Sequence, residues 1–184
     1  MARVLHALML AFCAAPGWAA DDWEELARPG AIALFRHATA PGVGDPQGMR
    51  LDDCSTQRNL DDQGRAEARR LGELFRGRRV AVGAVLTSQW CRARETAWLM
   101  FGEAAVREEP AFNSFFSQSA PQRQAQTEQA RAILARWNGP GVLVVVTHQV
   151  NITALTGAGA ASAQGVVVRL QPDGSLRVVG TVAP

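Results

Sequence analysis

The 184-residue chain contains no Lys and no Tyr, and it has only three His and three Cys. Without a lysine amine, Schiff-base catalysis and a Walker-type phosphate loop are both excluded. All 19 basic residues are Arg, and 17 acidic residues balance them to a formal net charge of +2. Because nucleic-acid-binding proteins concentrate an excess of basic residues on one face, no nucleic-acid partner is expected.

The first 19 residues have the pattern of a secretory signal peptide. Arg3 precedes an apolar stretch at 4–15, and small residues occupy the −3 and −1 positions of a cut after Ala19. This stretch is shorter than the ~20 residues that span a bilayer, so no stable membrane anchor is expected. We predict cleavage near Ala19 and a periplasmic or secreted protein. A buried first helix is the alternative.

Residues 20–184 are predicted to form a single domain, since they contain no internal repeat and no low-complexity linker. This part of the chain keeps two histidines, His37 and His148, and two cysteines, Cys54 and Cys91. It has no Cys-x-x-Cys pair of the kind that binds zinc. We therefore expect no metal and no cofactor.

Apolar runs and helical periodicity alternate along the chain. Strands are predicted at 31–35, 80–87 and 142–146, near Val106, and in a hairpin at 165–170 and 175–182. Helices are predicted at 60–76 with Asn59 as N-cap, at 91–101, and at 120–137, after a short helical turn at 23–28. This alternation predicts an α/β fold, a three-layer α/β/α sandwich with a mainly parallel central sheet.

Charged and titratable side chains follow three of these strands. Arg36 and His37 come after the first, Arg92 lies just beyond the second, and His148 follows the third. Ligands bind beyond the carboxyl ends of strands in such sheets, so one pocket is expected to receive two imidazoles and two guanidiniums. Arginine suits a phosphoryl group, whose charge is spread over its oxygens, and a neutral imidazole can attack phosphorus.

Four segments carry a resemblance to a known family. They are LFRHA at 34–38, NLDDQGRAEA at 59–68, TSQWCRARETA at 87–97 and VTH at 146–148. In this order they resemble the histidine phosphatase superfamily, also called phosphoglycerate-mutase-like. The resemblance implies that His37 accepts the phosphate, that Arg36 and Arg92 hold phosphoryl oxygens, and that His148 is the second pocket histidine. Thr39 is a further candidate phosphate ligand.

The sequence departs from the family at two positions. Ala38 replaces the usual Gly after the histidine, and the segment 112–114 ends in Ser114 where phosphoglycerate-mutase-like members have a Glu that protonates the leaving oxygen. Serine is no proton donor near neutral pH. Other candidates for the general acid are Asp45, Asp52 and Asp53 in the loop after the first strand, and Glu109.

Arginines outside the motifs have less support. Arg50, Arg58 and Arg94 are expected to be solvated, and a place for Arg58 in the pocket wall remains open.

The expected function is hydrolysis of a small extracytoplasmic phosphomonoester through a phosphohistidine, without a metal ion. One alternative is a phosphomutase, which needs the same pocket but must exclude water from the intermediate. Another is a catalytically impaired protein that binds phosphorylated ligands. The most distant is a metal-binding module built from His37, His148, Cys54 and Cys91. The natural substrate and the oligomeric state stay open.

The two cysteines of the exported chain are both expected near the pocket rim, because Cys54 lies in the loop after the first strand and Cys91 begins the helix after the second. A disulfide between them is geometrically possible and fits an oxidising compartment. Two free thiols are the alternative.

Overall fold

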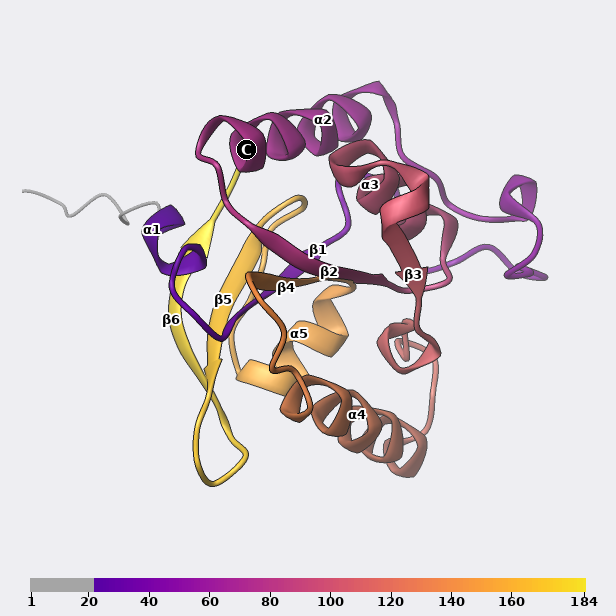
Figure 1. The fold of residues 1–184 in the computed structure, drawn as a ribbon. Helices are drawn as coiled ribbons and strands as arrows, with labels where there is room; N and C mark the ends of the chain where they lie inside the picture. The colour runs from indigo at the N-terminus through magenta and orange to yellow at the C-terminus, as the bar shows by residue number, and fades with distance from the viewer. Residues whose placement is uncertain (1–21) are drawn as a thin grey trace, which may run out of the picture.

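The computed structural model describes residues 22–184, so the predicted signal peptide lies outside the described residues. Six strands form one sheet in the order β3-β2-β4-β1-β5-β6 (Figure 1). Their bounds are β1 Ala31–Arg36, β2 Val82–Thr87, β3 Val106–Glu108, β4 Val142–Thr147, β5 Gly165–Leu170 and β6 Leu176–Val182. Neighbours from β3 to β1 are parallel, whereas β5 and β6 join antiparallel at one edge. The prediction of a mainly parallel sheet is confirmed.

Helices cover both faces of the sheet (Figure 1). On one face lie α2 (Asp62–Gly77) and α3 (Cys91–Phe101), and on the other lie α4 (Ala120–Ala135) and α5 (Gln149–Thr156). The short α1 is Trp23–Leu26, and three 3-10 turns are η1 (Cys54–Thr56), η2 (Glu103–Ala105) and η3 (Pro110–Phe112). The predicted three-layer sandwich is thus confirmed.

The apolar strands supply two separate cores because successive strand side chains point to opposite faces. In β1, Ala33 and Phe35 pack with the α2 and α3 side, whereas Ile32 and Leu34 pack with the α4 and α5 side. All six residues of β4 are buried, as expected for a central strand covered on both faces. These buried strands give the rim at their carboxyl ends a rigid base.

Some predicted boundaries were wrong. The N-cap of α2 is Asp61 rather than Asn59, because the Asp61 carboxylate accepts the backbone N–H of Gly64 at 2.8 Å. The Asn59 amide instead donates to the carbonyls of Cys54 and Gln57 in the preceding loop. The second strand begins at Val82, after a turn, and α4 ends at Ala135.

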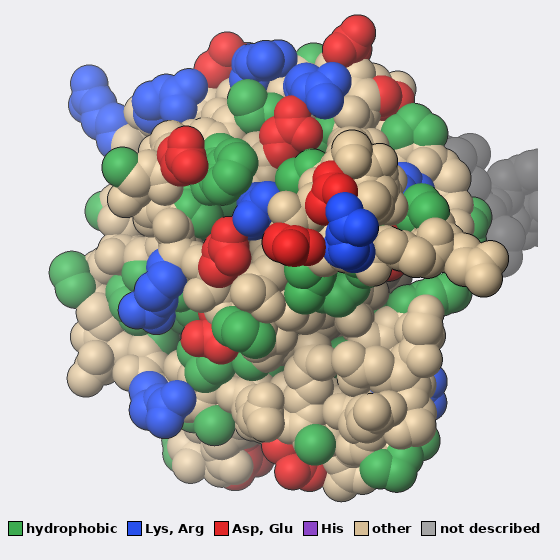
Figure 2. All heavy atoms as spheres, turned by 90° about the vertical axis from the view of Figure 1, so that its right-hand side faces the viewer, with side chains coloured by type: hydrophobic (Ala, Val, Ile, Leu, Met, Phe, Trp, Pro, Cys, Tyr) green, Lys and Arg blue, Asp and Glu red, His purple; other side chains and the backbone are tan. Residues whose placement is uncertain are grey.

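None of the helices in residues 22–184 is long and apolar enough to cross a membrane. On the face at the right of Figure 1, acidic and basic side chains are interspersed (Figure 2). That face therefore presents no broad area of one charge sign.

Candidate active site

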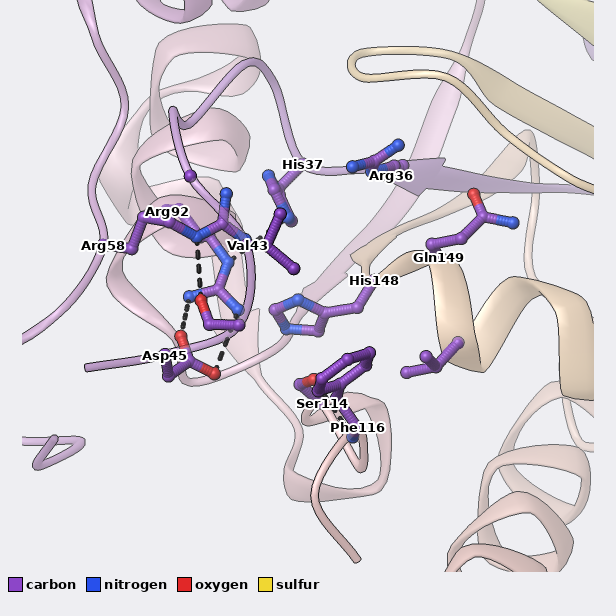
Figure 3. A pocket seen from close by; sticks show the side chains of 13 residues that line it. Arg36, His37, Val43, Asp45, Arg58, Arg92, Ser114, Phe116, His148 and Gln149 are labelled. Atoms are coloured by element: carbon purple, nitrogen blue, oxygen red, sulfur yellow. Dashed lines mark hydrogen bonds and ion pairs between the residues drawn. The ribbon is translucent and has the colours of Figure 1, made fainter. Parts of the chain in front are cut away.

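The carboxyl ends of β1, β2 and β4 meet at one rim, because these three strands are adjacent. The backbone N–H of His37 donates to Thr147 at 2.9 Å, and that of Ser88 donates to Val146 at 3.0 Å. A cavity of about 200 Å³ opens there (Figure 3). It is lined by Arg36, His37, Gly42, Val43, Gly44, Asp45, Arg58, Arg92, Ser114, Phe116, His148, Gln149 and Val150. The structure therefore brings the two imidazoles and two guanidiniums into one pocket.

The imidazole of His37 is held in one orientation by two hydrogen bonds. Its Nδ1 lies 2.8 Å from the carbonyl oxygen of Ala38, and a carbonyl can only accept, so Nδ1 carries a proton. On the other side of the ring, the Nε–H of Arg92 donates to Nε2 at 3.2 Å. Burial, and next the positive charge of Arg92, lower the pKa of His37 to about 3. At neutral pH the ring is therefore uncharged, with its lone pair on Nε2.

The guanidinium of Arg92 is almost fully buried, and each of its three nitrogens donates a hydrogen bond. Its Nη1 donates to Oδ1 of Asp45 at 2.5 Å, and its Nη2 donates to Oδ2 at 3.4 Å. The indole N–H of Trp90 also donates to Asp45 Oδ2, at 3.1 Å. Figure 3 shows the Asp45 carboxylate beside this guanidinium, within the cavity wall. A carboxylate thus occupies the fork that the sequence resemblance assigns to a phosphoryl group.

Two further arginines face the cavity. Arg36 donates through Nη1 to the carbonyl of Ala160 at 3.3 Å, whereas its buried Nε–H has no hydrogen-bond partner in the described chain. Arg58 donates through Nε to Gly44 at 2.9 Å and through Nη1 to Ala40. Burial, and next the nearby cation of Arg92, lower the pKa of both arginines. Such a cluster attracts an anion.

His148 is the second pocket histidine. Its Nε2 lies 2.8 Å from the hydroxyl of Ser88, and its ring meets that of His37 edge-on with centroids 5.3 Å apart. Burial lowers the pKa of His148 well below its usual value, and the charge of His37 acts in the same direction. His148 is therefore neutral at pH 7.

Thr39, in contrast, does not line the cavity. Its hydroxyl and its backbone N–H donate to the two carboxylate oxygens of Glu67, each at 2.9 Å. A side chain on Gly64 would meet the carbonyl oxygen of Thr39 at 2.0 Å, so glycine is required for this close approach. The motif residues Gly64 and Glu67 thus fasten the segment after His37 to α2.

The candidate general acids fall in different places. Asp45 lines the cavity, as does Ser114, whereas the other three carboxylates do not. Asp52 is exposed, Asp53 caps η1 through Ser55, and Glu109 accepts the N–H of Ala111 at the start of η3. Of the carboxylates predicted for this role, the structure places Asp45 alone beside the histidines.

Cys54 and Cys91 are joined, with their Cα atoms 5.7 Å apart. The Oε1 atom of Gln57 also accepts the Cys91 N–H at 2.9 Å, so the loop after β1 is fastened twice to the start of α3. Arg94, expected to be solvated, instead places Nη2 3.3 Å from each sulfur and pairs with Glu108. Among residues 22–184 no three His, Cys, Asp or Glu side chains cluster as a metal site would require.

The sequence profile of the histidine phosphatase superfamily (branch 1) matches residues 32–138. The chain belongs to the histidine phosphatase superfamily. No curated protein sequence matches it significantly.

Several solved structures share the fold. The protein histidine phosphatase SixA, complexed with tungstate, is 16% identical with a TM-score of 0.60, over 84% of this chain and 97% of that one. YhfR of Bacillus stearothermophilus is 18% identical with a TM-score of 0.58, over 82% and 95%. A mycobacterial glucosyl-3-phosphoglycerate phosphatase complexed with VO3 is 17% identical with a TM-score of 0.57, over 83% and 97%.

The structure adds contacts that the sequence did not supply. Arg58 lines the cavity, which is the alternative left open beside a solvated position. The Ser88 hydroxyl hydrogen-bonds His148, and the Trp90 indole hydrogen-bonds Asp45. Ser88 and Trp90 lie inside the matched segment 87–97, which marked their neighbourhood but not their partners. Arg58 directly precedes the matched segment 59–68, and this adjacency was its only signal.

Proposed function

We propose that this chain hydrolyses phosphomonoesters in an extracytoplasmic compartment, through a phosphohistidine formed on Nε2 of His37 and without a metal ion. The observation that carries the proposal is the fixed tautomer of His37. Its Nδ1–H is bound to the Ala38 carbonyl, so the lone pair resides on Nε2 in a pocket of guanidinium groups. A nucleophile that is already deprotonated needs no separate base.

The three cavity arginines supply the charge that phosphoryl transfer requires. The phosphoryl group in flight spreads negative charge over its oxygens, and donors fixed in advance stabilise that charge without reorganising. Arg36 lines the same cavity and adds its positive charge to it. We take the Ser88 hydroxyl to donate to Nε2 of His148, which puts the single proton of this neutral ring on Nδ1 as a further donor to the same group.

Asp45 is the best-placed proton donor for the leaving oxygen. In the free protein its carboxylate is bound to Arg92 and Trp90. A bound phosphoryl group competes for Arg92, and the released Asp45 carboxylate takes the proton that the monoester brings in as its monoanion. Asp45 then protonates the alcohol oxygen as the P–O bond breaks and the bond from His37 Nε2 to phosphorus forms. In the second step Asp45 takes a proton from the water that attacks phosphorus and frees His37.

The proposed extracytoplasmic localisation rests on two features of the chain. The first 19 residues have a signal-peptide pattern, and the only two cysteines beyond them are joined. Structural disulfides persist in oxidising compartments. Phosphomutases of central metabolism have their substrates inside the cell, so this localisation favours hydrolysis over transfer of the phosphoryl group within the substrate.

A phosphate-binding protein without turnover is the second candidate, and Ser114 in the place expected for Glu favours it. Release of phosphate from 4-nitrophenyl phosphate by the exported protein, with and without a chelator, separates the two. We expect release that persists with chelator, is lost in His37→Ala, and is unchanged in Arg70→Ala, a surface arginine paired with Glu73. Binding of inorganic phosphate with no release would establish the binder, and loss of turnover with chelator would contradict a metal-free reaction.

A further inference from the structure

The mouth of the cavity has an unusual share of exposed apolar surface. Among residues 22–184, the exposed large hydrophobic side chains are Val43, Phe116 and Val178, which are 93%, 59% and 39% exposed. Two of the three line this one cavity, and the half-buried Val150 lies with them. Apolar side chains gain free energy by leaving water, so exposed ones gathered at a pocket mark a surface that a ligand covers.

Val43 is held at the mouth by its neighbours. It lies between Gly42 and Gly44, whose φ angles of +95° and +70° glycine adopts without strain. The Arg58 guanidinium spans this turn from inside, donating to the carbonyls of Ala40 and Gly44. The same residue that adds positive charge to the cavity thus fixes the turn that presents Val43 to solvent.

Phe116 is presented by a similarly anchored segment. The neighbouring Phe115 is buried, and its carbonyl closes a turn with the N–H of Gln118 at 3.0 Å. Upstream, Asn151 donates to the carbonyl of Asn113 at 2.9 Å and ties the segment to α5. Figure 3 shows Val43 and Phe116 among the labelled side chains around His148.

The mouth offers little to a polar leaving group. Beyond the arginines and histidines, its polar side chains are Asp45, Ser114 and Gln149. Asp45 meets the ester oxygen itself in the proposed reaction, and not the rest of the leaving group. The Gln149 amide accepts the N–H of Ala160 and donates to Thr153, each at 2.9 Å. The Ser114 hydroxyl is the remaining polar group that could bind a leaving group, and it accepts one weak hydrogen bond from the Phe116 N–H at 3.5 Å. Sugar hydroxyls and nucleobases covered by such a surface would lose hydrogen bonds to water without replacement.

We propose that the site is selective for phosphomonoesters whose leaving group is apolar next to the phosphate, either an alkyl chain or an aromatic ring. This inference rests on the proposed phosphatase function. Val43 and Phe116 cover the leaving group, and the guanidiniums bind the phosphoryl group. Sugar phosphates and nucleotides are poor substrates of such a mouth.

Straight-chain alkyl phosphates from methyl to hexyl test this directly with the exported protein. Their leaving alcohols have nearly equal acidity, so kcat/KM along the series reports contact with the chain rather than chemistry. We expect kcat/KM to rise with length, by up to about fourfold per methylene if each is fully covered. Glucose 6-phosphate should fall below hexyl phosphate by at least tenfold.

Variants assign the effect to the mouth. The double change Val43→Ser and Phe116→Ser should flatten the length dependence, whereas Val178→Ser, the exposed valine on β6, should leave it intact. A parallel comparison of phenyl with 1-naphthyl phosphate separates a flat aromatic site from one for a chain. If the protein hydrolyses these esters with no length dependence and no gain from the larger ring, the inference about the leaving group is wrong while the proposed phosphatase function stands. No hydrolysis of any ester overturns the proposed function instead.

Discussion

Arg92 bridges His37 and Asp45: its Nε–H donates to Nε2 of His37 at 3.2 Å, while its Nη1 donates to Asp45 at 2.5 Å. One guanidinium therefore touches the proposed nucleophile and the proposed acid at once. The planar fork of arginine makes this geometry possible, whereas an ammonium group is a point charge with no such fork. This relation makes Arg92 the residue through which the two catalytic roles are coupled.

Replacing Arg92 should cost turnover without unfolding the protein. In Arg92→Ala the transition-state charge loses a fixed donor, and we expect kcat/KM to fall by on the order of 10²-fold or more. Arg92→Lys should restore little of the rate, because it keeps the charge and loses the fork. Steady-state kinetics with a melting curve for each variant checks this, and near-normal rates in either variant would remove Arg92 from the site.

The role of Asp45 as proton donor is tested by the leaving group. Asp45→Asn is nearly isosteric but cannot donate a carboxyl proton, so hydrolysis of an alkyl phosphate should drop far more than hydrolysis of 4-nitrophenyl phosphate. The nitrophenolate ion leaves without protonation, which is why it serves as the internal control. Equal losses on the two esters would show that Asp45 positions Arg92 and does not supply the proton.

The Cys54–Cys91 bridge should stabilise the exported protein. It spans 37 residues of sequence, and the chain-entropy relation gives roughly 3–4 kcal/mol for a loop of that size. Reductant should therefore lower the free energy of unfolding in urea, whereas a double variant with Cys54→Ser and Cys91→Ser should be insensitive to it. Mass spectrometry after alkylation provides the second readout, and two modified thiols in the exported protein would refute the bridge.

Stability should fall in mild acid because both pocket histidines resist protonation. The folded-state pKa of His37 is about 3 and that of His148 is also lowered, against an ordinary value of 6.5. The unfolded chain therefore binds more protons below pH 6.5, and the free energy of unfolding decreases as pH falls, by about 2 kcal/mol at pH 5 for His37, with His148 acting in the same direction. Urea titrations at pH 7, 6 and 5 measure this loss. His37→Asn should reduce it, and a pH-independent stability in this window would contradict the burial of the two rings.

Much of the fold followed from the alternation of apolar strands and amphipathic helices. The continuous apolar run of β1 predicts burial on both faces of the sheet, as the structure shows. It does not reveal which side chains point to which face. The errors fell at element ends, where side-chain caps compete: Asp61 and Asn59 are both good caps, and only the contacts of the preceding loop decide between them.

The site was predictable where a residue directly follows a strand, as His37, Arg36 and His148 do. The site was harder to predict where a loop folds back on it. No local sequence pattern reveals the path of the 20 residues after β1. That path turns Arg58 inward, brings Asp45 to Arg92, and leaves Thr39 on Glu67 rather than in the cavity. Long-range contacts of this kind depend on the packed tertiary structure.

Trapping the covalent intermediate gives the sharpest test of a nucleophilic His37. The protein is mixed with a phosphate ester, quenched rapidly in alkali and digested for mass spectrometry, because phosphohistidine survives alkali and is lost in acid. We expect a phosphoryl group on His37, absent from His37→Ala and retained in Arg70→Ala. A label carried by another residue, or one that persists in His37→Ala, would contradict it.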